Sequence, residues 1–402
     1  MVRMGMIGCG TMSGAYLRQM DALSDRLRFT GLVDVDLARA KAASAAATVA
    51  AGARASTNSE DIIDEVDAVV IAVPHDLHRD YAVQFLEAGK HVLIEKPLAN
   101  TERECVEIID AADRSDRVAM HGYVMRYTPL VREYARLIRE ETYGPCFHLS
   151  IWTEQYTDRS RGQWIGQAAR VGGGQFFSHG CHYVDLLFHM LGSPVSGTHV
   201  GTNLGTPWME MEGTSNVSLA FESGATAYHF GTWGARGSKL RYAMHAHCEG
   251  GMLELDYHSG DIRLWLEPAH GELPATAAAP TPQEAGVEGA ADEGAADEGA
   301  ADEEAVGGRC AVIYHVEPGA KHTSAEMTHF LDCIEQNRQP ETTLRAGLQG
   351  LRAIWRLYEA ERRGVVADLR GLALENYSAE PDPFLAETKR FGYTCRLDEL
   401  RL

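Results

Sequence analysis

The chain has 402 residues, 45% of them apolar, with 57 acidic and 37 basic side chains and a net charge of −20. This length exceeds one ordinary hydrophobic core and predicts two domains, while the acidic balance argues against a nucleic-acid partner, which needs clustered Lys and Arg. No apolar run reaches the roughly 20 residues of a membrane-spanning helix, and eight scattered cysteines without a C-x-x-C pair favour reduced thiols in a cytoplasm.

The first 125 residues alternate apolar strands with helices. Four runs rich in Val, Ile, Leu and Met predict buried strands, namely RMGMIG, RFTGLVDVD, DAVVIAVP and KHVLIEKP. Helical segments such as LARAKAASAAATVA and HRDYAVQFLEAG separate these runs. Strands of this composition that alternate with helices are typical of a parallel sheet covered on both faces. We therefore expect residues 1–125 to form an α/β domain.

Beyond residue 125 the pattern changes to longer segments with period-two alternation, such as CFHLSIWTEQY and KLRYAMHAHCEGGMLELDYHSGDIRLWLE. Such alternation predicts an antiparallel sheet with one covered face. Helices are expected at 179–191 and near the C-terminus. We therefore expect an α+β domain over residues 126–370 with a large, mainly antiparallel sheet. The other face of that sheet is the expected contact of a homodimer or homotetramer.

The composition of residues 272–308 predicts a disordered acidic insertion. Positions 284–305 hold nine acidic residues and no basic one, in a five-residue AADEG repeat. This repeat matches neither the period of a packed helix nor that of a strand, and it offers nothing bulky to bury. A segment that binds a partner is the alternative interpretation. Residues 371–402 are expected to form a C-terminal tail.

A glycine-rich turn, GMIGCGTMSGAYL, follows the first strand and opens a helix. Gly8 can make the tight turn, Gly10 lets the backbone approach a diphosphate, and the helix that begins at Thr11 and Met12 offers N–H groups to the phosphates. Asp34 ends the next strand, where a carboxylate binds the 2'-hydroxyl of NAD. The turn therefore predicts an NAD(P)-binding Rossmann domain with NAD as the cofactor. Arg39 in the following helix leaves NADP open.

The stretch AVPHDLHRDYAVQFLEAGKHVLIEKPLANT resembles the glucose-fructose oxidoreductase / inositol dehydrogenase (Gfo/Idh/MocA) family. The resemblance extends to GYVMRYTP, to GGGQFFSHGCHYVD and to the closing helices. It implies that Lys96 lies beside the nicotinamide and hydrogen-bonds the reacting hydroxyl. It also implies cofactor contacts from residues that match the family's motifs, namely Pro74, His78, Glu95 and Lys96.

The position of Lys96 has independent physical support. Pro97 disfavours helical geometry at Lys96 and leaves it extended at the C-terminal end of a strand, where open parallel sheets bind ligands. A cation there stabilises the oxyanion that develops as an alcohol is oxidised. The alternative is a surface lysine paired with Glu95, although adjacent strand residues point to opposite faces.

Positions 178–191 predict a helix with Ser178 near its N-cap. One face then carries His182, Asp185 and His189, which together could ligate iron or zinc. However, the third ligand lies two turns from the first and no second acidic cluster completes the shell, so we expect no metal. His189 is expected to pack in the core. His182 is the candidate for proton transfer, since imidazole can accept an alcohol proton near neutral pH.

The family pattern here is three glycines followed by D-x-x-x-H-x-x-D. The resemblance implies that His182 is the general acid or base and that Asp185 holds substrate. This chain departs at the first Asp, where Ser178 stands, so we expect His182 to be a weaker base unless another carboxylate acts on it. Because of this departure, an NAD-dependent glycosidase of the same superfamily stays an alternative function. Such glycosidases carry a T-H-G motif, which the triplet Ser178-His179-Gly180 resembles.

We expect an NAD(P)-dependent dehydrogenase or reductase that acts on a secondary hydroxyl or keto carbon of a sugar, inositol or related polyol. Lys96 and His182 are the expected catalytic residues. A non-catalytic regulator that senses the dinucleotide is the alternative from a different class. Further candidates for the substrate pocket are aromatic, basic or hydroxyl-bearing residues, namely Arg126, Tyr127, Trp152, Trp164, Ser178 and His179.

Overall fold

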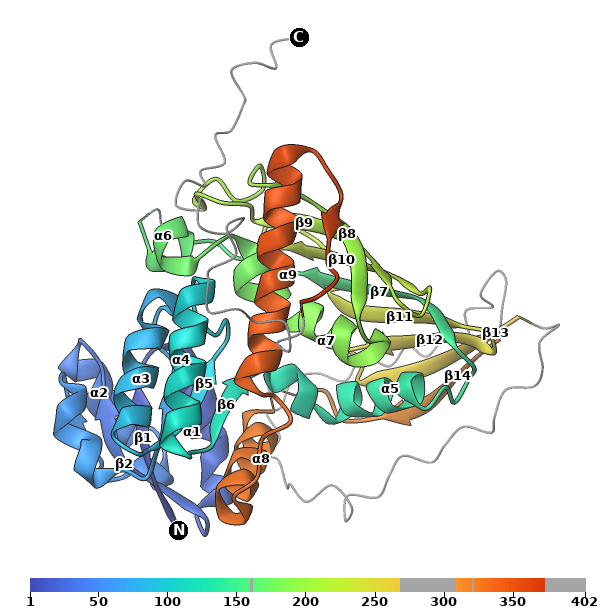
Figure 1. Ribbon diagram of the computed structural model, residues 1–402. Helices are drawn as coiled ribbons and strands as arrows, with labels where there is room; N and C mark the ends of the chain where they lie inside the picture. The colour runs from blue at the N-terminus through green and yellow to red at the C-terminus, as the bar shows by residue number, and fades with distance from the viewer. Residues whose placement is uncertain (160–161, 268–308, 320–321, 373–402) are drawn as a thin grey trace.

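A six-stranded parallel sheet forms the N-terminal part of the chain (Figure 1). The computed structural model describes residues 1–159, 162–267, 309–319 and 322–372. The strands follow the order β3-β2-β1-β4-β5-β6. They are β1 (Val2–Ile7), β2 (Leu27–Val33), β3 (Arg54–Ser56), β4 (Ala68–Ile71), β5 (His91–Glu95) and β6 (Ala119–Gly122). Order and direction are those of a dinucleotide-binding Rossmann sheet, as predicted.

Both faces of this sheet are covered, because its strands place apolar side chains on both faces. Along β4, Val69 and Ile71 join the core beneath α3 and α4, whereas Ala68 and Val70 join the core beneath α1 and α2. The four helices are α1 (Thr11–Met20), α2 (Leu37–Ala45), α3 (His78–Glu87) and α4 (Glu102–Ser115). Helix α4 begins with a reciprocal capping box between Thr101 and Glu104.

A nine-stranded sheet forms the second part of the chain, in the order β14-β13-β12-β11-β7-β10-β9-β8-β15. Only the β7–β10 pair is parallel, which confirms the predicted mainly antiparallel sheet. The strands are β7 (Cys146–Glu154), β8 (Pro194–Thr202), β9 (Thr214–Phe221), β10 (Thr226–Thr232), β11 (Tyr242–Cys248), β12 (Gly251–Asp256), β13 (Asp261–Leu266), β14 (Arg309–His315) and β15 (Ala367–Asp368).

Helices pack against the second sheet, namely α5 (Pro129–Arg139), α7 (Cys181–Leu191) and α9 (Leu344–Arg363). The short α6 (Ala168–Val171) instead contacts the turn at His75–Leu77 of the first part. The long helix α9 contacts α4 and β6 of the first sheet as well as α7 and β8 of the second (Figure 1). Helix α8 (Thr323–Gln336) packs against α1 through Met327, Phe330 and Leu331, although it lies about 300 positions later in sequence.

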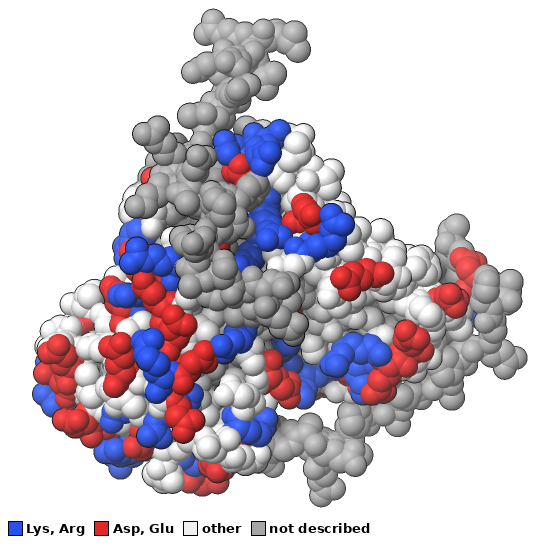
Figure 2. Space-filling view, in the orientation of Figure 1, with Lys and Arg blue, Asp and Glu red and all other residues white. Residues whose placement is uncertain are grey.

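Charged side chains of both signs intermingle over the N-terminal part on the face shown in Figure 2. Helix α4 contributes to this pattern, since Arg79 and Arg103 both pair with Glu107. The predicted insertion 272–308 lies outside the described residues, as does all but the start of the predicted tail 371–402. No helix in the described ranges is long and apolar enough to cross a membrane.

Candidate functional site

The turn between β1 and α1 has the shape that a dinucleotide diphosphate needs. Gly8 adopts φ +92°, and a Cβ there would lie 2.4 Å from the carbonyl oxygen of Ala72, so only glycine fits. A Cβ at Gly10 would meet no atom within 4 Å, which leaves the backbone open to a ligand. Helix α1 begins at Thr11, followed by Met12, and no side chain caps its N-terminus. A negatively charged group can therefore bind there.

Asp34 lies directly beside this turn. It is 8% exposed, and its carboxylate accepts hydrogen bonds from the backbone N–H groups of Cys9 and Asp36, both at 2.8 Å. These bonds hold the carboxylate at the C-terminal end of β2, next to the glycine turn. This is the position from which a carboxylate reaches the ribose hydroxyls of a bound dinucleotide. The residues around the turn therefore fit NAD.

His78 connects the ends of β4 and β5. Its ring nitrogens lie 2.8 Å from the carbonyl oxygen of Pro97 and 3.0 Å from that of Val73, and the ring is fully buried. Burial lowers the pKa of His78 and favours the neutral ring. Pro74 leads into the short turn that carries His78. The predicted cofactor contact His78 thus also holds the segment that follows Lys96.

Glu95 is buried at the end of β5 and belongs to a polar group that sequence reasoning missed. The Tyr16 hydroxyl lies 3.1 Å from Glu95 Oε1 and 2.7 Å from Glu326 Oε2. Tyr16 comes from α1 and Glu326 from α8, so three distant segments meet here. No sequence motif connects them, because only the packing of α8 against α1 brings Glu326 to this position.

Lys96 reaches across to the second part of the chain. Its Nζ donates a hydrogen bond of 2.9 Å to the backbone oxygen of Ser178. The Glu95 carboxylate accepts a hydrogen bond of 3.2 Å from the backbone N–H of Lys96. The Lys96–Pro97 peptide bond is cis. The structure thus brings the lysine of the E-K-P segment to the start of the segment that carries His182.

The predicted N-cap at Ser178 is wrong, because the helical segment begins earlier, with a π-helical turn over Phe176–Gly180. The backbone N–H of Ser178 already bonds to the oxygen of Gly174 within the helix. Groups from elsewhere in the fold satisfy the preceding N–H groups: Glu212 accepts from Gln175 and Phe176, and the Tyr358 hydroxyl accepts from Gly174 and Phe177. A cap supplied by other elements carries no local sequence signal.

His182 lies 3% exposed on α7, one turn after Ser178. Its ring centre is 5.9 Å from that of Tyr123 and 6.2 Å from that of His179. The His179 ring in turn contacts Tyr242 and Trp233. His182 therefore lies among aromatic rings at the junction of the two parts. Tyr123 and Trp233 carried no signal in the sequence, since aromatic residues are equally common in cores.

Asp185 forms a two-bond ion pair with Arg126. Both carboxylate oxygens accept from the guanidinium at 2.6 Å, and the side chains are 3% and 12% exposed. Burial opposes the charge on Arg126, but the Asp185 carboxylate overrides it and raises the pKa of Arg126. The structure thus joins two predicted substrate contacts into one buried pair, with a guanidinium presented beside the carboxylate.

The remaining candidates lie in different surroundings. The Trp164 ring packs edge-on against His75, a buried residue at the end of β4 that the sequence reasoning did not single out. Tyr127 lies in the core under α8, with its hydroxyl 2.9 Å from Thr342 Oγ1, apart from His182. Trp152 packs against His245 on the second sheet. Among the described side chains, no group of three or more His, Cys, Asp or Glu residues is arranged to hold a metal ion.

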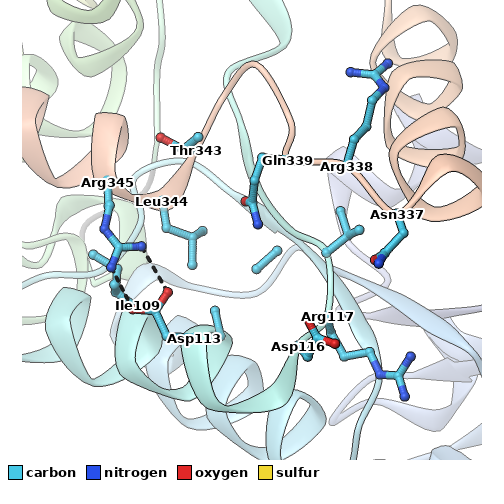
Figure 3. A pocket seen from close by; sticks show the side chains of 13 residues that line it. Ile109, Asp113, Asp116, Arg117, Asn337, Arg338, Gln339, Thr343, Leu344 and Arg345 are labelled. Carbon is cyan, nitrogen blue, oxygen red and sulfur yellow. Dashed lines mark hydrogen bonds and ion pairs between the residues drawn. The ribbon is translucent and has the colours of Figure 1, made fainter.

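A separate cavity of about 420 Å³ lies between the end of α4, the start of β6 and the α8–α9 connection (Figure 3). Arg117 and Arg338 reach its edge, and Arg345 pairs with Asp113 at 2.6 Å and 2.9 Å. Lys96 and His182 do not line it. This cavity is therefore distinct from the candidate reaction site.

Comparison with known families matches both parts of the chain. Residues 2–123 match a family model described as "Oxidoreductase family, NAD-binding Rossmann fold". Residues 131–254 match the model of the GFO/IDH/MocA C-terminal domain. The two matched ranges carry the glycine turn, Lys96 and His182.

Curated relatives match over part of their length. Inositol 2-dehydrogenase 2 of Saccharopolyspora erythraea is 34% identical over 151 residues, which cover 37% of this chain and 44% of that protein. An uncharacterized oxidoreductase of Streptococcus pneumoniae is 30% identical over 209 residues, 51% of this chain and 54% of that protein. The chain thus spans about half the length of these relatives.

Solved structures share the fold over nearly the whole chain. The aldose-aldose oxidoreductase of Caulobacter crescentus, crystallised with glycerol, superposes with a TM-score of 0.73 at 24% identity and covers 91% of this chain and 99% of its own. A levoglucosan dehydrogenase in complex with NADH and levoglucosan gives 0.74 at 19% identity, with 92% and 99% coverage. At these identities the likeness shows the fold alone.

Proposed function

Since the chain belongs to the Gfo/Idh/MocA oxidoreductase family, we propose that it transfers a hydride between NAD and a carbon bearing a secondary hydroxyl, on a sugar, inositol or related polyol. The hydrogen bond between Lys96 and Ser178 carries this proposal. It supports the proposal, because the cation of the E-K-P segment bonds to the helical segment that leads into His182.

Bound nicotinamide would accept or return the hydride. Lys96 stabilises the negative charge that develops on the substrate oxygen, because a positioned cation in a partly buried site interacts strongly with an oxyanion. His182 exchanges the hydroxyl proton, and its burial among Tyr123 and His179 excludes bulk water. The Asp185–Arg126 pair holds the substrate one turn further along α7 from His182, with Arg126 donating to substrate oxygens.

The preference for NAD over NADP rests on Asp34. A carboxylate at the ribose position favours the free 2'-hydroxyl and repels a 2'-phosphate. The named activities of relatives support the substrate class, since they include inositol 2-dehydrogenases and a levoglucosan dehydrogenase. Trp164 and His179 are proposed to contact the sugar ring, because aromatic faces stack on sugar C–H groups.

The test is NADH formation across a panel of inositols, aldoses and anhydrosugars, with the parent protein, Lys96→Ala and His182→Ala. We expect turnover by the parent and a loss of two or more orders of magnitude in kcat for each variant. NAD affinity is expected to stay unchanged in His182→Ala, because only Lys96 is also an expected cofactor contact. Unchanged kcat in both variants would exclude the proposed roles. Release of an aryl aglycone would favour a glycosidase, and tight NAD binding without turnover would favour a sensing role.

The open face of the second sheet is the proposed subunit contact. A shallow hollow there is lined by small polar and aromatic side chains from β7 to β10, among them Ser150, Ser218, Thr226 and Tyr228. Light scattering measures the molar mass in solution, and we expect that of a homodimer or homotetramer. Tyr228→Glu places a charge on this face and is expected to give the molar mass of a monomer. A cytoplasmic location stays a prediction from the sequence.

A further inference from the structure

Two cysteines lie opposite one another on neighbouring strands of the second sheet. In the antiparallel pairing of β7 with β11, Cys248 is the partner of Cys146, while His247 is the partner of His148. Phe147 is therefore an extra residue on β7, a β-bulge.

The bulge decides which face Cys146 occupies. Strict alternation from the buried Leu149 would turn Cys146 to the outer face. Because the bulge shifts the alternation by one, Cys146 packs against the inner core together with Cys248, and Phe147 is left 56% exposed. The two thiols thus share one face at directly opposed positions.

The two opposed thiols act on each other's pKa. A hydrogen bond from Cys248 lowers the pKa of Cys146, whereas the same bond and burial raise the pKa of Cys248. Cys146 is also the more exposed of the two, since Cys248 is 6% exposed. Because the thiolate is the nucleophile, Cys146 is the sulfur that an oxidant meets first.

The backbone separation suits a covalent bond. Directly opposed residues of an antiparallel pair have Cα atoms about 4.5–5.5 Å apart. Disulfides span Cα separations of roughly 4.4–6.8 Å. Both cysteines are free thiols in this structure.

We propose that Cys146 and Cys248 are a redox-sensitive dithiol that a hydroperoxide converts to a cross-strand disulfide. The Cys146 thiolate attacks the terminal peroxide oxygen, the O–O bond breaks, and the alcohol or water leaves with the proton. This leaves a sulfenic acid on Cys146. The Cys248 sulfur then attacks the Cys146 sulfur, the S–O bond breaks, and water leaves. The peroxide is reduced and two thiols are oxidised.

This site is remote from the proposed reaction. Cys146 lies seven residues along β7 from Thr153, which pairs with Tyr242, and the Tyr242 ring is 6.0 Å from that of His179. Seven strand residues span roughly 23 Å. The disulfide therefore joins two central strands without touching Lys96 or His182, and turnover is expected to persist while resistance to heat increases.

Peptide mapping tests the proposal on the full chain. Cleavage after Lys and Arg releases fragments 140–159 and 242–263, which contain Cys146 and Cys248 as their only cysteines. After hydrogen peroxide, alkylation with iodoacetamide and digestion, we expect these fragments as one linked species that separates on reduction. Free alkylated fragments at a peroxide dose that oxidises the exposed Cys310 would overturn the proposal, as would linkage of Cys146 to another cysteine.

Variants assign the order of steps. With Cys248→Ser, Cys146 is expected to stop at the sulfenic acid and to be trapped by dimedone, without a linked species. With Cys310→Ser, a matched change of an exposed thiol on β14, the linked species is expected to persist unchanged. The linked species in the parent protein does not depend on how either variant folds.

Discussion

The Nζ atom of Lys96 lies 2.9 Å from the backbone oxygen of Ser178, 82 positions later in the chain. This contact crosses from the end of a parallel strand to the start of the helical segment of the second part. The backbone oxygen of residue 178 anchors the lysine whatever its side chain is. This anchor therefore does not depend on the side chain at 178, which lies one turn before His182.

Introducing the missing charge is expected to change the pH dependence of the reaction. In Ser178→Asp a carboxylate one turn before His182 stabilises the imidazolium and raises its pKa. The acid limb of kcat/KM for alcohol oxidation should then move to higher pH by about one unit. Ser178→Asn adds similar bulk without charge and is the matched control. An identical acid limb in both variants would show that position 178 does not act on the base.

The Asp185–Arg126 pair is expected to show strong coupling in a double-mutant cycle. Asp185→Leu leaves a buried guanidinium without its partner and should cost about 3–5 kcal/mol of unfolding free energy, as should Arg126→Met for the carboxylate. The double variant should lose much less than the sum, because it leaves no uncompensated charge. Urea unfolding of the four proteins measures the coupling, and additive losses would contradict it.

The two glycines of the nucleotide turn are expected to respond differently to alanine. Gly8→Ala combines a left-handed φ with a clash against Ala72, and should cost at least about 1–2 kcal/mol of stability. Gly10→Ala has free space and φ −90°, so it should fold as the parent does. Its methyl group would instead prevent the close approach of the diphosphate to the backbone, and should raise the Kd for NAD by about tenfold. Calorimetric titration and thermal unfolding separate the two effects.

His121 is expected to make the protein less stable in acid. It is fully buried on β6, neither ring nitrogen has a hydrogen-bond partner among the described residues, and burial, with His78, Arg126 and Lys96, lowers its pKa to about 3. In the unfolded chain the His121 ring is protonated below about pH 6.5. In the folded chain the ring stays neutral until the pH approaches about 3. Stability should therefore fall as pH decreases between these values, by about 1.4 kcal/mol per pH unit for this group.

Comparing His121→Asn with the parent by urea unfolding near neutral pH and near pH 5 isolates this contribution. The variant should lose less stability on acidification. His229→Asn is the matched comparison, because His229 is also fully buried and burial lowers its pKa to about 3. An unchanged pH slope in both variants would contradict the explanation.

Local patterns in the sequence pointed to several residues of the candidate site. The glycine turn, Asp34 and Lys96 were predicted because each depends on its strand: a parallel strand ends, and the next residues face the ligand edge of the sheet. The same reasoning placed Ser178 at a helix N-cap and was wrong. Glu212 and Tyr358 cap that helix from distant segments, and a local pattern cannot report such partners.

The two-sheet architecture, the nucleotide turn and the residue types at the candidate site could all be predicted from the amino-acid sequence. These follow from periodicity and from turn chemistry, which act between neighbours in the chain. Only the tertiary structure decided that Lys96 meets Ser178, that Asp185 pairs with Arg126, and that Glu326 from α8 joins Glu95 through Tyr16. Those contacts join residues 59 to 310 positions apart, and they form because packing of the apolar faces brings their elements together.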